Sequence, residues 1–121
     1  MKILVVDDNQ ELANVIQGAL EDEGWEVISA KDGIDGYDAF LSFQPDLVIT
    51  DIQMPGVSGL KMMENIRMHN PMVKTIYISG NIAAFRPSIE IEKKRYPVSV
   101  FEKPFSLMSL TRLVTNPQLI F

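Results

Sequence analysis

One apolar segment near the middle of the chain limits the possible folds more than any other feature. It is the run Leu-Val-Ile-Thr-Asp at residues 47–51, which lies between Pro45 and Pro55. A short run with β-branched residues and no polar alternation is typical of a strand buried on both faces. Such strands occur in parallel sheets covered by helices, and these sheets bind ligands at the carboxyl ends of their strands. Asp51 ends the run, so its position suits chemistry as well as a turn or a helix cap.

The rest of the chain alternates between short apolar segments and segments with helical spacing. Four more strands are expected at residues 3–6, 26–30, 75–78 and 98–101, with 26–30 nearer an edge of the sheet. The apolar positions expected to face the core are Leu12, Val15, Ile16, Ala19 and Leu20 in the first helix, Ile34, Tyr37, Phe40 and Leu41 in the second, Leu60, Met63 and Ile66 in the third, and Leu107, Leu110, Leu113 and Val114 in the last.

The fourth helical segment is the hardest to interpret. It contains Pro87, which can begin a helix but fits poorly inside one, so a helix is expected to begin near Arg86 and Pro87 or the segment to be irregular there. Five strands that alternate with five helices predict an α/β fold. Its core would be one doubly wound, five-stranded parallel sheet with helices on both faces.

The composition fits a single globular domain over residues 1–121 and excludes several classes of function. Apolar residues make up 46% and charged residues 22%, which are the values of a folded chain. The net charge of −5 disfavours direct binding to nucleic acid. The chain has no cysteine and a single histidine, His69, which excludes disulfides and Cys- or His-rich metal centres. The N-terminal apolar run ends in acids after four residues, which predicts a strand in a cytoplasmic protein rather than a signal peptide or a membrane span.

Five polar residues that could carry chemistry follow the expected strands. Asp7 and Asp8 follow the first strand, Asp51 ends the third, Ser79 ends the fourth and Lys103 follows the fifth. Taken singly, each residue also fits a turn, a cap or a solvated position. If these four strands supply neighbouring carboxyl ends, all five side chains meet in one crevice. Their number at four strand ends favours a site.

Three carboxylates in one crevice repel one another, so they hold protons or bind a cation. Oxygen ligands without a cluster of His or Cys favour a hard cation, and Mg²⁺ above others. A carboxylate beside Mg²⁺ and Lys103 can attack a phosphoryl group, because both positive charges neutralise the phosphoryl oxygens during transfer. Ser79 would add a hydroxyl donor to one of those oxygens.

These residues resemble the receiver domains of two-component response regulators, the CheY-like family, from Lys2 to about Val114. The matching motifs are Val5-Val6-Asp7-Asp8-Asn9, Asp51-Ile52-Gln53-Met54-Pro55-Gly56 with Gly59, Ser79-Gly80, and Lys103-Pro104-Phe105. The resemblance implies a flavodoxin-like fold and a phosphorylation-dependent signalling switch. Asp51 would accept a phosphoryl group from a sensor histidine kinase or a phosphotransfer protein. The domain would be a regulatory phosphoacceptor rather than an enzyme, able at most to catalyse its own phosphorylation and dephosphorylation.

The same resemblance implies a role for each residue of the site. Asp8, Asp51 and the backbone carbonyl of Gln53 would bind Mg²⁺ directly, and Asp7 would act mainly through water. Lys103 would pair with the phosphoryl group, and the peptide bond that follows Lys103 would be cis.

The family pattern also implies a switch made of Ser79 and Phe101. Phosphorylation would draw Ser79 toward the phosphate, and Phe101 would turn into the vacated space. The face made by the fourth helix, the fifth strand and the fifth helix would then change and contact an unknown downstream protein. The segment 82–96 departs from the family pattern, because it contains Pro87 and because Arg-Tyr-Pro at 95–97 stands where Gly-Ala is usual. This departure affects the output face and leaves the motifs of the site intact.

Two other kinds of protein share part of this pattern. A Mg²⁺-dependent phosphatase of the haloacid-dehalogenase type also uses an Asp nucleophile, but it normally has a second acid two residues later, where this chain has Gln53. A flavodoxin-like cofactor binder would have a Ser-, Thr- or Gly-rich loop after the first strand, where this chain has Asp7-Asp8-Asn9. No DNA-binding or catalytic region follows Phe121, which fits a stand-alone receiver or a receiver cut from a larger protein.

Overall fold

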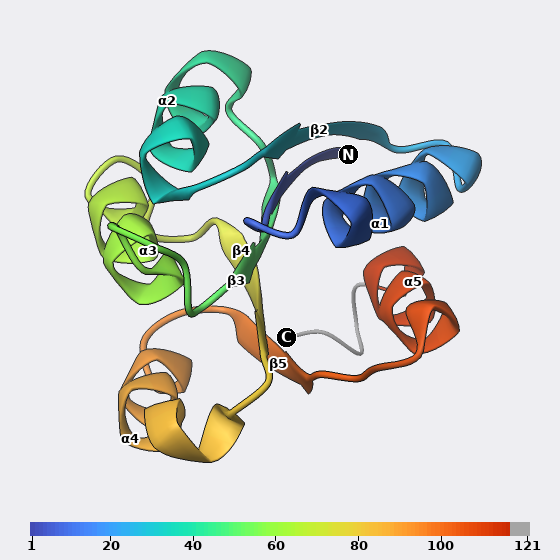
Figure 1. Ribbon diagram of the computed structural model, residues 1–121. Coiled ribbons are helices and arrows are strands. Elements are labelled where there is room, and N and C mark those ends of the chain that lie inside the picture. Colours follow the sequence, from blue (N-terminus) through green and yellow to red (C-terminus); the bar gives the residue numbers. More distant parts are fainter. Residues whose placement is uncertain (117–121) are drawn as a thin grey trace.

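The computed structural model describes residues 1–116, in which strands and helices alternate along the chain (Figure 1). The strands in this range are β1 (Lys2–Val6), β2 (Glu26–Ala30), β3 (Leu47–Asp51), β4 (Lys74–Ser79) and β5 (Val98–Glu102). The helices are α1 (Gln10–Asp22), α2 (Gly33–Phe43), α3 (Gly59–Arg67), α4 (Ile82–Lys93) and α5 (Leu107–Thr115). None of the helices described is long and apolar enough to cross a membrane.

The strands form one parallel sheet in the order β2-β1-β3-β4-β5. β3 lies at its centre and pairs with β1 on one side and β4 on the other, with Asp51 opposite Ile78. Every residue of β3 is buried, as its apolar run predicts. This order confirms the predicted doubly wound fold and places β2 at an edge. It also makes β1, β3, β4 and β5 consecutive neighbours, so their carboxyl ends share one edge of the sheet.

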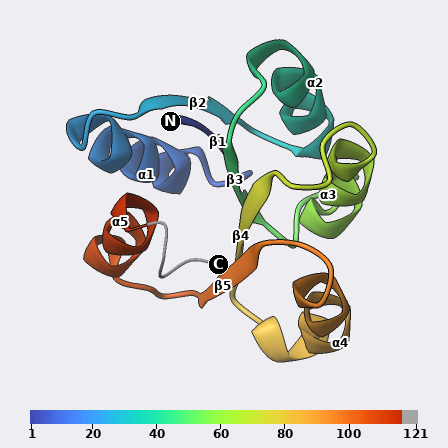
Figure 2. The ribbon, with the colours of Figure 1, turned by 180° about the vertical axis from the view of Figure 1, so that it is seen from behind.

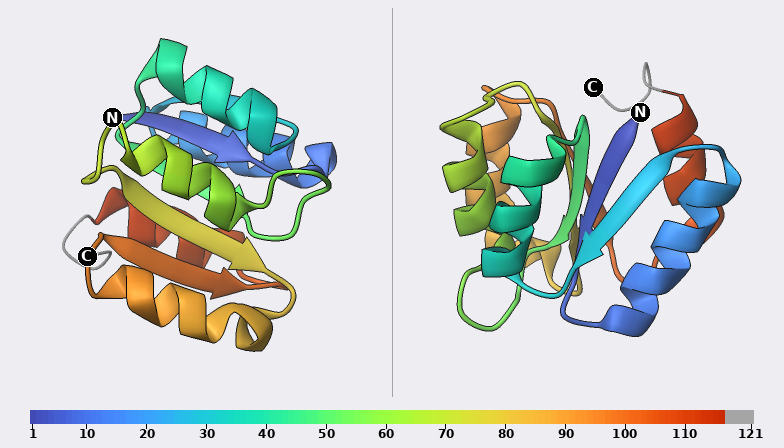
Figure 3. Two further views of the ribbon diagram at one scale, coloured as in Figure 1. Left: turned by 90° about the vertical axis from the view of Figure 1, so that its left-hand side faces the viewer. Right: turned by 90° about the horizontal axis from the view of Figure 1, so that it is seen from above.

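Helices cover both faces of the sheet (Figures 2 and 3). α1 and α5 lie on one face, and α2, α3 and α4 lie on the other. Successive strand residues point to opposite faces, so each face has a core of its own. The core under α1 and α5 includes Ile3, Val5, Ile16, Leu20, Ile49, Ile78, Leu110 and Val114. The core under α2, α3 and α4 includes Leu4, Val6, Phe40, Val48, Met62, Met63, Tyr77 and Ile89.

Each helix in the described range begins at a polar side chain that accepts a hydrogen bond from a backbone N–H of the first turn. These N-cap residues are Asn9, Asp32, Ser58, Asn81 and Ser106. A cap of this kind satisfies an N–H group that would otherwise have no partner within the helix. Each of these caps follows a strand of the parallel sheet, so all five described helices begin at the carboxyl edge where the acidic residues lie.

α4 begins earlier than the position of Pro87 predicted. The helix is continuous from Ile82 to Lys93 and holds Pro87 inside it, so the expected start near Pro87 is wrong. The Asn81 side chain accepts a hydrogen bond from the N–H of Ala84 at 3.3 Å and stabilises a first turn upstream of the proline. Pro87 has no N–H for the carbonyl four residues earlier, so α4 lacks one of its internal hydrogen bonds.

Some apolar residues predicted to face the core are exposed to solvent. The exposed fraction is 54% for Val15, 63% for Ile34 and 43% for Leu41. The residues of α2 that are buried are Gly33, Gly36 and Phe40. A Cβ atom at Gly36 would lie 2.6 Å from the sulfur of Met62, so α2 approaches the core through its glycines. The face predicted for this helix is therefore right for Phe40 and Tyr37, which pack against the core, and wrong for Ile34 and Leu41.

Candidate functional site

Three aspartates meet at the carboxyl edge of the sheet. Asp7 and Asp8 follow or adjoin the end of β1, and Asp51 ends β3. One carboxylate oxygen of each lies within 4.8 Å of the other two. Asp7 is 1% exposed and Asp51 is 7% exposed, whereas Asp8 faces solvent. The structure thus brings together the three acids, as their positions after the strands predicted.

Lys103 supplies positive charge to this acidic cluster. Its Nζ lies 3.0 Å from Oδ2 of Asp51 and 3.4 Å from Oδ2 of Asp7. Its backbone N–H donates to the carbonyl of Ser79 at 2.9 Å, and the peptide bond between Lys103 and Pro104 is cis. Burial alone would lower the pKa of Lys103, but the hydrogen bond to Asp51 and the charges of both acids outweigh burial and raise it. Lys103 is therefore protonated at neutral pH.

Burial disfavours the charged form of Asp7 in this cluster. Burial raises the pKa of Asp7 above its ordinary value, and the neighbouring charge of Asp51 adds to this effect. The backbone N–H of Asn9, 2.8 Å from Oδ1 of Asp7, and the ammonium of Lys103 act in the opposite direction without cancelling it. The cluster therefore has one cation for three carboxylates, which is a site that favours a further cation.

The donor atoms of the cluster fit a hard divalent cation. All three residues offer carboxylate oxygens, and within residues 1–116 no other group of three potential ligands lies so close together. Two of the carboxylates are oriented by backbone N–H groups: Asn9 binds Asp7, and Gln53 donates to Oδ1 of Asp51 at 3.2 Å. Gln53 is exposed at the start of the loop after β3. Its predicted role as a carbonyl ligand stays a prediction.

The backbone around Asp51 is tightly packed. The hydroxyl of Thr50 donates to the carbonyl of Asp51 at 2.9 Å, and the N–H of Gly59 donates to the carbonyl of Ile52 at 2.8 Å. A Cβ atom at Gly59 would lie 2.1 Å from the carbonyl oxygen of Asp51. Only a glycine lets the start of α3 approach the end of β3 so closely, which gives Gly59 of the second motif a structural reason.

The two residues of the predicted switch are not brought together. Ser79 is fully buried at the end of β4, and its Oγ accepts a hydrogen bond from the N–H of Asn81 at 3.0 Å. Phe101 packs under α1 and α5, where its ring centroid lies 5.7 Å from that of Phe105. Tyr77 faces the other side of the sheet, under α2, α3 and α4. Because Ser79 comes two residues after Tyr77 on the same strand, its side chain points to that side too, away from Phe101. The predicted switch would therefore act across the sheet, and coupling between Ser79 and Phe101 stays a prediction.

A second polar cluster, absent from the expectations above, lies between α3, β4 and α4. Arg67 forms an ion pair with Glu92 and donates to Oγ1 of Thr75 at 3.0 Å. The hydroxyl of Tyr77 donates to the same Glu92 oxygen at 2.6 Å. We call Arg67, Thr75, Tyr77 and Glu92 the α4 cluster. In the sequence, Arg67 and Glu92 resemble ordinary surface charges on two helices, and nothing in their spacing indicates that they meet.

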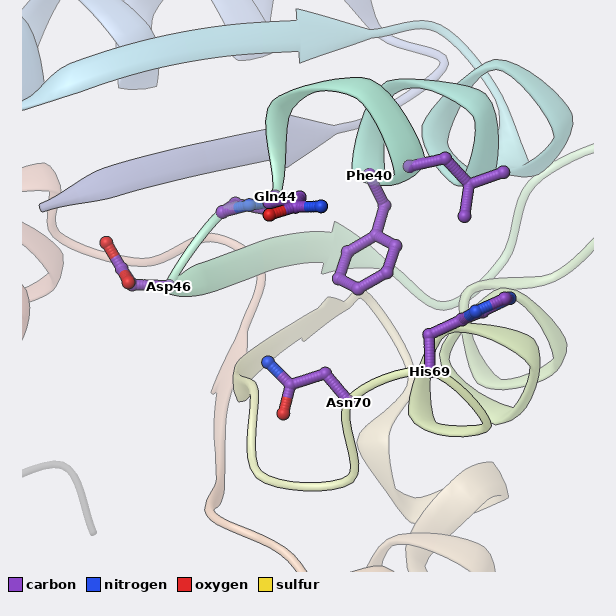
Figure 4. A pocket seen from close by; sticks show the side chains of 7 residues that line it. Phe40, Gln44, Asp46, His69 and Asn70 are labelled. Atoms are coloured by element: carbon purple, nitrogen blue, oxygen red, sulfur yellow. The ribbon is translucent and has the colours of Figure 1, made fainter.

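A pocket of about 400 Å³ lies away from this chemistry (Figure 4). Its lining residues are Phe40, Leu41, Gln44, Pro45, Asp46, His69 and Asn70. Pro45 and Asp46 immediately precede β3, so the pocket lies at the amino end of the strand that carries Asp51 at its other end. His69 lies with its Nε2 2.7 Å from the hydroxyl of Tyr37. The pocket therefore contributes nothing to the acidic site.

Comparisons with known proteins agree with this geometry. The family model described as the response regulator receiver domain matches residues 3–115. Similar curated proteins of Mycobacterium tuberculosis are the probable transcriptional regulatory protein TcrX, 35% identical over 81 residues, and the transcriptional regulatory protein TrcR, 33% identical over 80 residues. The matches cover 67% and 66% of this chain but 35% and 31% of those proteins. The chain thus spans about a third of the length of the curated relatives it matches.

Solved structures of receiver domains have the same fold. A receiver domain protein from Clostridium thermocellum has a TM-score of 0.81 at 28% identity, over 95% of this chain and 91% of that one. The response regulator TrrA from Thermotoga maritima, solved in complex with Mg(2+)-BeF, has a TM-score of 0.79 at 31% identity, over 94% and 96%. The family model and these structures cover almost all of the described residues. This chain therefore belongs to the response regulator receiver domains, the regulatory domains of two-component signalling.

Proposed function

We propose that this chain is a phosphorylation-dependent switch in which Asp51 accepts a phosphoryl group from a sensor histidine kinase or a phosphotransfer protein. The observation that carries the proposal is the position of Asp51. Its carboxylate lies 3.0 Å from the ammonium of Lys103 and within 4.8 Å of the carboxylates of Asp7 and Asp8. The match to receiver domains supports it and favours neither a phosphatase of the haloacid-dehalogenase type nor a flavodoxin-like cofactor binder.

In the proposed reaction, a carboxylate oxygen of Asp51 attacks the phosphorus atom of phosphohistidine. A P–O bond forms to Asp51, the P–N bond breaks, and the histidine nitrogen keeps the electron pair. The product is an acyl phosphate. Oδ1 of Asp51 is oriented by the N–H of Gln53 and Oδ2 by Lys103, so the carboxylate is held in place before the donor arrives.

The neighbours of Asp51 have separate proposed roles. Lys103 neutralises a phosphoryl oxygen during transfer. Ser79 donates its hydroxyl hydrogen to another, since its Oγ accepts from the N–H of Asn81 and this leaves the hydroxyl free to donate. Mg²⁺, bound directly by Asp8, Asp51 and the carbonyl of Gln53 and mainly through water by Asp7, would supply the remaining positive charge. TrrA, which has a similar fold, was solved in complex with Mg(2+)-BeF, and this supports the choice of Mg²⁺ as the ion.

A groove beside Lys103 suits the docking of the donor protein. It has a volume of about 310 Å³ and is lined by Leu12, Val15, Lys103, Pro104, Phe105 and Leu107. Val15 is 54% exposed although it is apolar. The donor must bring its phosphohistidine to Asp51, and a protein seated in this groove lies next to the lysine that contacts Asp51.

The downstream partner is a protein that distinguishes the phosphorylated form from the unphosphorylated form. We expect phosphoryl transfer and partner binding to take place in the cytoplasm, without direct contact between this chain and nucleic acid.

The proposed function is tested with acetyl phosphate and Mg²⁺, which replace the donor protein. Intact-mass measurement is expected to show the addition of one phosphoryl group to the unchanged protein and to Asp38→Asn, a control at an exposed aspartate on α2. Asp51→Asn is expected to gain none, and Lys103→Met to gain it at least tenfold more slowly. Phosphoryl addition to Asp51→Asn at the normal rate would refute the assignment.

A further inference from the structure

α4 is attached to the domain by few apolar contacts. Its buried residues are Ile82 and Ile89, and Phe85 is partly buried. The shorter α3 buries Gly59, Met62, Met63, Ile66 and Arg67. α4 also lacks one internal hydrogen bond because of Pro87. The position of α4 therefore depends on polar contacts to a greater extent than that of α3.

The α4 cluster provides such contacts at the last turns of the helix. Oε1 of Glu92 is bound both by Nη1 of Arg67 and by the hydroxyl of Tyr77. The guanidinium of Arg67 also lies over the ring of Tyr96, 4.4 Å from its centroid. The Arg67 side chain is 4% exposed, so moving Glu92 away would leave a buried charge without its partner. The cluster thus opposes any displacement of the C-terminal half of α4.

The same strand connects this cluster to the phosphorylation site. Tyr77 precedes Ser79 by two residues on β4, and Oγ of Ser79 is bound by the N–H of Asn81, the N-cap of α4. A hollow of about 420 Å³, lined by the loop after β3 and by Phe85, lies beside α4. A hydrogen bond from Ser79 to a phosphoryl group would displace Ser79 and, through Asn81, the N-terminus of α4. The α4 cluster fixes the C-terminus of the same helix through Glu92.

We infer that the α4 cluster is a brake on the response of α4 to phosphorylation. This inference rests on the proposed function of Asp51. In the unphosphorylated protein the cluster stabilises the observed position of α4, and phosphorylation must outweigh it. A change that weakens the cluster lowers the free energy of the displaced state relative to the observed one. By linkage, the same change raises the affinity for a phosphoryl group or its mimic at Asp51.

Two conservative variants test the inference with beryllofluoride and Mg²⁺ as the probe. Tyr77→Phe removes one hydrogen bond to Glu92 and keeps the ring, and Glu92→Gln removes the charge and keeps the shape. Glu90→Gln, at an exposed position of the same helix, is the matched control. We expect faster amide hydrogen exchange in α4 without ligand and a beryllofluoride Kd that is lower by about fivefold or more in both variants. The control should match the unchanged protein in both measurements.

The possible results separate this inference from the function on which it rests. Faster exchange with an unchanged Kd would mean that the cluster is only structural and would overturn the inference, as would a Kd that rises. If Glu90→Gln also lowered the beryllofluoride Kd, the effect would come from the charge of the helix and not from the α4 cluster, and the inference would again be overturned. If Glu92→Gln does not fold, Tyr77→Phe decides alone. Failure of the unchanged protein to bind beryllofluoride would instead refute the proposed function, and the inference with it.

Discussion

Replacement of Asp7 by asparagine tests the electrostatics of the acidic cluster directly. The carboxylate of Asp7 attracts Nζ of Lys103 at 3.4 Å and repels that of Asp51 within 4.8 Å. With an effective dielectric constant of about 20, the attraction is about −5 kcal/mol and the repulsion is at least about +3.5 kcal/mol, so they largely cancel. The main remaining difference between Asp and Asn is the cost of burying a charge, which amounts to several kcal/mol per ion before hydrogen bonds offset it.

The direction of the effect follows from the raised pKa of Asp7. A carboxyl group with a higher pKa in the folded than in the unfolded protein reduces stability as the pH rises through its folded-state pKa. Asp7→Asn carries no group that titrates at this position, so the variant should have a higher free energy of unfolding than the unchanged protein above the folded-state pKa of Asp7. This difference should disappear below pH 3.8, the ordinary pKa of an aspartate. We expect Asp7→Asn to be more stable than the unchanged protein by about 1–2 kcal/mol in metal-free buffer at pH 7, with about 4 °C in Tm for each kcal/mol.

Mg²⁺ should reverse this order. A ligand at 100 times its Kd stabilises the folded protein by about 2.7 kcal/mol. Asp7→Asn has lost one carboxylate of the acidic cluster, so it should bind Mg²⁺ more weakly and be stabilised less by the same Mg²⁺ concentration. Thermal unfolding with EDTA and with saturating MgCl₂ measures both effects, and Asp38→Asn serves as the control at an exposed aspartate. The reasoning is refuted if Asp7→Asn is the less stable protein in EDTA, or if Mg²⁺ stabilises both proteins equally.

Two further predictions concern packing, and both are tested by measuring the free energy of unfolding in urea. Gly59→Ala should lower this free energy by about 1–3 kcal/mol, because the new Cβ atom would overlap the carbonyl oxygen of Asp51. Gly18→Ala, which has open space around it in α1, should raise it by about 0.5–1 kcal/mol, and equal effects of the two changes would contradict the close approach of α3. Ile34→Ser should change stability by no more than about 0.5 kcal/mol and Phe40→Ala should lose about 3–5 kcal/mol, since Ile34 is exposed and Phe40 is buried; a large loss at Ile34 would restore the face of α2 predicted from periodicity.

The acidic site could be predicted from sequence because each of its residues adjoins a strand with a clear pattern. The run that ends at Asp51 is apolar without interruption, and Asp7 follows another apolar run. The order of the strands could not be read from these patterns, because any buried strand can pair with any other. The step from four separate strand ends to one crevice needed either the fold or the resemblance to a family.

Features that depend on distant partners escaped prediction. Arg67 and Glu92 lie 25 positions apart on different helices, and only the fold shows that they meet at Tyr77. In α2 the glycines decide which side approaches the sheet, and a glycine adds nothing to an apolar pattern.

The central place of β3 determines where the effect of a modification can appear. Its backbone is hydrogen-bonded to a strand on each side, so the segment that carries Asp51 cannot shift without breaking the ladder with both neighbours. Any rearrangement has to be absorbed by the surrounding loops and by a helix with few buried residues, such as α4. The proposed phosphorylation would thus act at a stiff centre, and we expect a partner to recognise changes at the more compliant periphery.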